Sequence, residues 1–118
     1  MRDIKFRAWD SYENKMYPVI QDEAINLMQY TGLKDRNGKE IYEGDILKIR
    51  LGTGFMTTVE VKFIDGCFDV CAIHGHIYTE SRPNGKTLHR KRDHLKYYTA
   101  NNAVEIIGNI YENPELVV

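Results

Sequence analysis

Apolar and polar residues alternate most regularly in TTVEVKFID, residues 57–65. Val59, Val61 and Phe63 fall on one face of this segment. The opposite face carries Thr58, Glu60, Lys62 and Ile64. A period of two is typical of a β-strand with one buried face. The pattern therefore predicts a strand here.

Two further segments show the same alternation. Residues 4–9 alternate Ile4, Phe6 and Ala8 with more polar neighbours, and residues 46–51 place Ile49 and Leu51 on either side of a charged residue. Residues 16–20 offer an antiparallel return for the first of these, with Pro18 favouring an edge position because proline has no N–H to donate. A hairpin is predicted near the N-terminus.

Dipeptides that tolerate positive φ angles separate the predicted strands. Asn37-Gly38, Gly44-Asp45 and Asp65-Gly66 each indicate a tight reversal, and Gly52 and Gly54 interrupt the strand before them. The third reversal leads into residues 67–80, which we expect to continue a meander. The last strand, which includes Val104, Ile106 and Ile110, is expected to carry a bulge at Gly108 and to end at Pro114.

Two segments allow more than one interpretation. Asp22 is able to cap a short helical turn through residues 23–24, yet residues 25–31 also fit a strand. Between Thr87 and Tyr98, Leu88 and Leu95 are spaced as in a helix, while a Pro-Asn-Gly loop precedes them. We expect a short helix or an irregular excursion there.

Together these patterns predict a mainly β protein with a small SH3-like barrel or roll. Additional N-terminal strands and at most one or two short helices complete the prediction, since short, strongly twisted strands bury apolar side chains by curling. The chain has 118 residues, 42% hydrophobic and 28% charged, which suits one ordinary globular domain over residues 1–118.

The sequence also indicates in which cellular compartment the protein is expected. Charged residues interrupt the N-terminus, so we expect no signal peptide, and no stretch approaches the roughly 18 apolar residues that a spanning helix requires. Cys67 and Cys71 are too few for a disulfide framework and are interpreted as free thiols. We therefore expect a cytoplasmic protein without membrane contact.

Three parts of the chain stand out together. They are IKFRAWD with KMYPV near the start, YTGLKDRNGKEIYEGDILK in the middle and EIIGNIYENPEL near the end. In these parts the chain resembles the YopX family of phage and prophage proteins. The resemblance implies a mostly β fold with an SH3-like barrel portion, encoded by bacteriophages or by prophages. It implies no known activity and assigns no site residue.

Several enzyme and metal hypotheses find little support in the spacing. On an extended strand, Cys67 and Cys71 lie roughly 13 Å apart, too far for one zinc ion, although His74 and His76 are close enough to share one. No signature accompanies a cysteine nucleophile, and the carboxylates are scattered. We therefore expect no catalytic residue, metal or other cofactor, with a small metal- or cysteine-dependent enzyme as a minor alternative.

The glycines of LGTGF, residues 51–55, superficially resemble a phosphate-binding loop. The segment lacks the Lys-Ser/Thr pair of a P-loop and the helix that would follow it. We interpret it as an ordinary loop or bulge.

One segment suggests a class of ligand. The chain has a net charge of -1, but between residues 82 and 96 six cations face only Asp93. Cations neutralise phosphates and aromatic rings stack on bases, so nucleic acid or an acidic protein is a candidate ligand, against a solvated loop as the simpler interpretation. The candidate contacts are Arg82, Lys86, Arg90, Lys91, Arg92, Lys96, Tyr97 and Tyr98.

The number of aromatic residues suggests that the protein associates with partners. Eight tyrosines, four phenylalanines and one tryptophan exceed what a small barrel interior holds, so some rings must reach the surface. Unpaired strand edges offer a second route to association. We therefore expect a non-enzymatic binding module that forms a homo-oligomer or docks to a host or phage protein, with nucleic-acid binding as the alternative.

Overall fold

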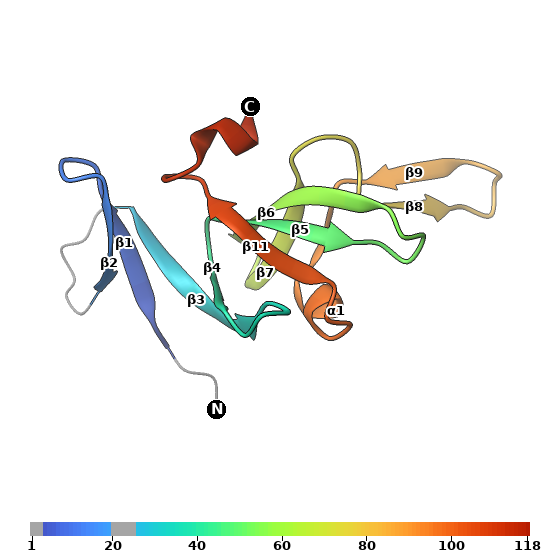
Figure 1. Cartoon of the computed structure of the whole chain (residues 1–118). Coiled ribbons are helices and arrows are strands. Elements are labelled where there is room, and N and C mark those ends of the chain that lie inside the picture. The colour runs from blue at the N-terminus through green and yellow to red at the C-terminus, as the bar shows by residue number, and fades with distance from the viewer. Residues whose placement is uncertain (1–3, 20–25) are drawn as a thin grey trace.

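The computed structural model describes residues 4–19 and 26–118, the Val19 side chain excepted, and shows a mainly β architecture (Figure 1). Its N-terminal sheet has the strand order β2-β1-β3-β4, so that β2 lies at the edge. The strands are β1 (Phe6–Asp10), β2 (Lys15–Val19), β3 (Leu27–Lys34) and β4 (Glu40–Tyr42). The predicted N-terminal hairpin is thus present, with Pro18 in its edge strand.

A five-stranded sheet curls into a half-barrel around the main core. Its order is β10-β7-β6-β5-β11, and every neighbouring pair is antiparallel. The strands are β5 (Asp45–Arg50), β6 (Met56–Ile64), β7 (Cys67–Ala72), β10 (Arg92–His94) and β11 (Val104–Asn109). Alternate residues such as Leu47, Ile49, Val59 and Val61 face inward and are fully buried. Leu95 also reaches this core, from the residue before the short helix α1 (Lys96–Thr99).

A two-stranded hairpin projects from the half-barrel (Figure 1). It consists of β8 (Tyr78–Ser81) and β9 (Thr87–Arg90), which pair with each other and with no other described strand. The chain ends in a 3₁₀ turn, η1 (Pro114–Val117).

The turn dipeptides act as the sequence predicts. Asp65 and Gly66 have φ angles of 50° and 82°, the pair of positive values that joins two twisted strands through a two-residue turn. At the Asn37-Gly38 reversal only the glycine has a positive φ, and the loop is closed by a hydrogen bond from the Asp35 N–H to the Lys39 carbonyl.

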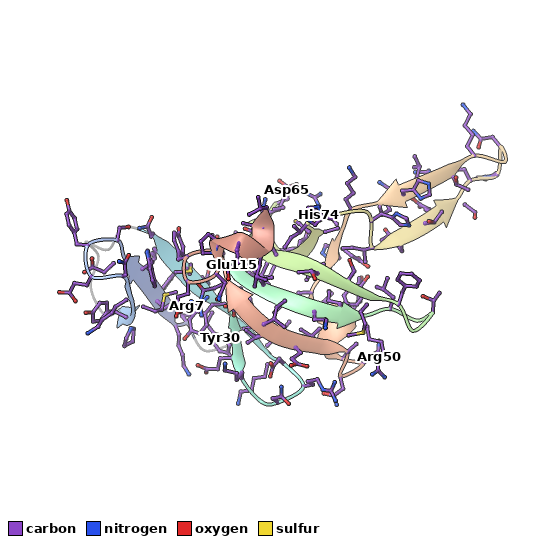
Figure 2. All side chains as sticks on the ribbon, turned by 45° about the horizontal axis from the view of Figure 1, so that its top comes forward. Arg7, Tyr30, Arg50, Asp65, His74 and Glu115 are labelled. Atoms are coloured by element: carbon purple, nitrogen blue, oxygen red, sulfur yellow. The ribbon has the colours of Figure 1, made fainter. Side chains whose placement is uncertain are left out.

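A joint between the N-terminal sheet and the half-barrel is built around a buried ion pair. The Arg7 guanidinium lies 2.5 Å from the Asp45 carboxylate and 4.6 Å from the Tyr42 ring centroid. Burial raises the pKa of Asp45, against the opposing effects of Arg7 and of the Tyr42 N–H. Trp9 stacks on Tyr111 at 5.9 Å beside this pair. Figure 2 shows Arg7 at this junction.

The mainly β prediction, with a curled barrel-like sheet, extra N-terminal strands and few helices, is confirmed. The bulge near Gly108 is also present, because the β11–β5 register shifts between Ile106 and Gly108. Residues 27–31 form part of a strand, β3, while the helical turn considered at Asp22 falls outside the described residues.

Two local predictions were only partly right. Residues 87–98 are mostly extended, as β9 and β10, and only α1 at their end is helical. Leu88 is 39% exposed on the hairpin whereas Leu95 is buried, so their helical spacing reflects no common face. The predicted meander is present as β5, β6 and β7, but residues 78–80 do not continue it, because β8 leaves the sheet and β10 takes the place beside β7.

Candidate functional site

The basic segment identified in the sequence does not form one patch. Arg82 and Lys86 lie at the hairpin turn, Arg90 ends β9, and Arg92 lies in β10. Lys96, Tyr97 and Tyr98 belong to α1, which Figure 1 shows apart from the tip of the hairpin. The segment therefore spans several surfaces.

Glu80 pairs with both hairpin arginines. Its Oε2 accepts hydrogen bonds of 2.8 and 2.6 Å from Nε and Nη2 of Arg90, and it lies 3.5 Å from Arg82. The bond from Arg90 lowers the pKa of Glu80 and raises that of Arg90. Because these two bonds occupy the Nε–Nη2 edge of the guanidinium, Arg90 offers a phosphate only its remaining N–H groups in this state.

Asp69 neutralises a third arginine. Its carboxylate, almost fully buried on β7, lies 3.2 Å from Nε of Arg92 and 2.8 Å from Nδ1 of His94. Asp69 is distant in sequence from both residues, and the β7–β10 pairing places it opposite His94. Sequence reasoning missed this cluster because that pairing has no local signal.

The aromatic residues of α1 differ in availability. The Tyr98 hydroxyl donates a 2.6 Å hydrogen bond to Asp93, and burial together with this bond raises the pKa of Tyr98. Tyr97 is 53% exposed, with the Lys96 ammonium 5.6 Å from its ring centroid. Only the Tyr97 ring is exposed enough for a base to stack on it.

Lys86 and Lys91 complete the basic segment. Neither lysine forms an ion pair with the residues that the structure describes. Lys96 likewise forms no ion pair with the described residues, so three lysines of the segment keep charges that a ligand can use.

A largely apolar groove lies at the base of the hairpin. We call it the hairpin groove; its volume is about 800 Å³. Phe55, in the loop between β5 and β6, is 74% exposed at this groove, and Met56 and Tyr78 are 43% and 41% exposed. The lining comprises Leu51, Gly52, Thr53, Phe55, Met56, Thr57, His74, Gly75, His76, Ile77, Tyr78, Thr79 and Tyr98.

The cysteine and histidine candidates separate in space. Cys67 is exposed, whereas burial raises the pKa of the partly buried Cys71 thiol. Nε2 of His74 lies 3.0 Å from the Val118 carbonyl oxygen, next to the C-terminal turn (Figure 2), and His76 contacts His89 instead. In residues 4–19 and 26–118, no three His, Cys, Asp or Glu side chains are grouped as metal ligands.

The glycine segment at residues 51–55 is a tight loop. The Leu51 N–H donates to the Phe55 carbonyl, and Gly54 has a φ of 87°. The loop presents Phe55 at the rim of the hairpin groove, which agrees with its interpretation as a loop.

Comparison with known proteins gives the family. A family model described as YopX protein matches residues 18–118. The chain belongs to the YopX family. Among solved structures, protein yopX from Bacillus subtilis is similar to this YopX-family chain, with 26% identity, a TM-score of 0.50, and coverage of 97% of this chain and 76% of that chain.

A second solved structure supports the fold. Protein EF1440 from Enterococcus faecalis is 24% identical, with a TM-score of 0.60 and coverage of 100% of both chains. No curated protein matches this YopX-family chain. In the described part of the chain, no helix is long and apolar enough to cross a membrane.

The stretches that carry the YopX resemblance meet at the joint between the two sheets. Arg7 of the first contacts Asp45 of the middle one, and the Asp35 carboxylate of the middle one accepts a 3.0 Å hydrogen bond from the Ile106 N–H of the last. These stretches therefore build the scaffold, while the hairpin groove is formed mainly by residues outside them.

Proposed function

We propose that this YopX-family chain is a non-enzymatic binding module of a phage or prophage, acting in the bacterial cytoplasm. In this proposal it docks to a protein partner through the hairpin groove and the adjoining β8–β9 hairpin. The observation that carries it is the concentration of exposed apolar side chains at the base of a projecting hairpin.

The groove has the character of a protein-binding surface. Phe55, Met56 and Tyr78 present aromatic and thioether side chains around one hollow. Large apolar groups of this kind, gathered rather than scattered, are typical of interaction sites. Burial of Phe55 by a partner would remove most of its apolar surface from water, a contribution of roughly 1.5–3 kcal/mol.

The hairpin supports the same proposal. All side chains of β8 and β9 are exposed or partly exposed, and the outer edges of both strands have unpaired backbone groups. An isolated two-stranded hairpin is marginally stable in water. A partner that added a strand to either edge or packed on Leu88 would therefore stabilise it.

Charge pairing favours a protein over nucleic acid as the partner. Arg82, Arg90 and Arg92 already face carboxylates of this chain. Phosphate binding would have to displace these carboxylates. Nucleic acid remains the second candidate because Lys86, Lys91 and the exposed Tyr97 ring are available on the same segment.

The test compares two surface variants in affinity capture from an infected or lysogenic host. Phe55→Ser removes the groove side chain. Ile4→Ser is the matched control, since Ile4 is 73% exposed and does not line the hairpin groove. We expect Phe55→Ser to reduce recovery of a specific host or phage protein at least about tenfold, as loss of an aromatic hot spot does, and Ile4→Ser to preserve it. Equal recovery by both variants would contradict the proposal.

Two further measurements separate the alternatives. Sedimentation velocity of the purified chain distinguishes a second copy, as in the expected homo-oligomer, from a different protein. Binding of single- and double-stranded oligonucleotides at about 50 and 200 mM salt tests the nucleic-acid alternative, because phosphate contacts make affinity fall steeply with salt.

A further inference from the structure

Two histidines meet at the base of the hairpin. His76 precedes β8 and His89 lies in β9, and their ring centroids are 4.5 Å apart with an interplanar angle of 42°. The Ile77 N–H donates a 2.7 Å hydrogen bond to the Arg90 carbonyl, which extends the hairpin pairing to the residue next to His76. The backbone therefore holds the two rings together.

Both rings direct a nitrogen towards the same hydroxyl. Oγ1 of Thr79 lies 3.4 Å from Nε2 of His76 and 3.1 Å from Nδ1 of His89, and Thr79 is directly opposite His89 in the strand register. The Thr79 hydroxyl has one proton, so it donates a hydrogen bond to only one of these two nitrogens. The nitrogen of the other ring donates its N–H to Oγ1. Two imidazole nitrogens therefore face one shared polar site.

We propose that His76 and His89 bind a divalent transition-metal ion, with Zn²⁺ as the physiological candidate. Imidazole suits Zn²⁺, Cu²⁺ and Ni²⁺, whereas Mg²⁺ and Ca²⁺ prefer oxygen ligands. Zinc–nitrogen bonds of about 2.0–2.1 Å are shorter than the 3.4 and 3.1 Å that separate these nitrogens from Oγ1 of Thr79, so the ion would take the place of the hydroxyl between the two rings. Both rings are then neutral, with their protons on Nδ1 of His76 and Nε2 of His89.

The site has two protein nitrogens and open coordination positions. Both histidines are exposed, so water can complete the coordination of the ion. Lys91 adds a positive charge nearby, and the affinity is expected to be lower than in structural zinc sites with four protein ligands. His76 also lines the hairpin groove, but the inference does not rest on the proposed protein partner, because its test uses the chain and the ion alone.

Binding at this site would join the two hairpin strands. The ion would connect His76, before β8, to His89 in β9, and a ligand that binds the closed hairpin stabilises it against opening. At a Zn²⁺ concentration of about ten times the dissociation constant, amide exchange through hairpin opening is expected to slow about tenfold.

The experiment titrates Zn²⁺ into the purified full chain by calorimetry, with Mg²⁺ as the control ion. His76→Gln and His89→Gln each remove one ligand, and His74→Gln removes the neighbouring histidine, whose Nε2 faces Val118 instead. We expect one Zn²⁺ per chain, at least tenfold weaker binding in either ligand variant, and unchanged binding in His74→Gln. Hydrogen exchange of the β8–β9 amides, measured on the same samples, should slow with Zn²⁺ in the unmodified chain and in His74→Gln only.

Three results would overturn the proposal. They are no Zn²⁺ binding at about 200 µM, wild-type affinity in both ligand variants, and an equal loss of affinity in His74→Gln. Thermal unfolding without metal shows whether each variant is folded, and two independent ligand variants keep the test decisive if one of them is not.

Discussion

Asp35 is a single side chain that links the Asn37-Gly38 reversal to β11. Its Oδ1 accepts hydrogen bonds of 2.8 and 2.9 Å from the N–H groups of Asn37 and Lys39, and its Oδ2 accepts one of 3.0 Å from Ile106. Asp35 is only 7% exposed. Burial raises the pKa of this carboxyl, but the hydrogen bonds from the three N–H groups together lower it by more than burial raises it. The pKa of Asp35 therefore lies below its ordinary value.

Two substitutions separate these bonds. Asp35→Asn retains one oxygen for the turn but places an amide NH₂ against the Ile106 N–H, so we expect a loss of about 2 kcal/mol, the value of one hydrogen bond to a charged group. Asp35→Ala also removes the turn contacts, which resemble a helix cap, and we expect about 3 to 4 kcal/mol in total. Asn37→Ala is the control, expected within about 0.5 kcal/mol because its side chain is exposed.

The assay is urea unfolding of the three variants and the wild type at pH 7, repeated down to pH 3. Because the folded pKa of Asp35 is lowered, its ionisation stabilises the fold above the ordinary pKa of about 4, and this contribution is lost as pH falls through the folded value. The difference between wild type and Asp35→Asn should therefore shrink below about pH 4. The reasoning would be refuted if Asp35→Asn were as stable as Asn37→Ala at pH 7. It would also be refuted if the stability difference between wild type and Asp35→Asn stayed constant down to pH 3.

Two further predictions concern other parts of the fold. Gly44 and Gly38 have similar φ angles of 87° and 82°. A Cβ on Gly44 would lie 3.0 Å from the Met28 sulfur, whereas one on Gly38 would meet nothing within 4 Å. In urea unfolding, Gly44→Ala should therefore be more destabilising than Gly38→Ala by about 1 kcal/mol or more. Similar losses in both variants would show that packing at Gly44 is unimportant. Cys67 should react several-fold faster than Cys71 with a thiol reagent such as DTNB, because burial raises the pKa of the Cys71 thiol and shields the thiol from the reagent. Single Cys→Ser variants measure the two rates separately, and equal rates would contradict this prediction.

Local sequence signals were sufficient for the central strands. The inward alternation of Val59 and Val61, followed by Asp65-Gly66, specifies β6, its turn and β7 without knowledge of the rest of the chain. Phe63 continues the alternation but lies near the end of β6. Its side chain contacts the Phe68 ring and is still 46% exposed. Periodicity therefore indicates the face of a residue but not how far the sheet covers it.

Non-local pairing explains the failures. Residues 92–94 are extended because β7 offers an unpaired edge, and the Leu88 and Leu95 spacing gave a false helical signal. The charge of the basic segment was also misleading, since Glu80 and Asp69 lie outside it in sequence but beside its arginines in space. The hairpin groove could not be predicted, because it joins the 51–57 loop to residues 74–79.

The most direct test of the proposed binding surface is photo-crosslinking inside an infected or lysogenic host. A benzophenone amino acid replaces Phe55 in one variant and Ile4 in another. The two side chains are almost equally exposed (74% and 73%), but only Phe55 lines the hairpin groove. The account predicts a discrete protein adduct from position 55 and none from position 4. The same adducts from both positions, or no adduct from position 55, would contradict it.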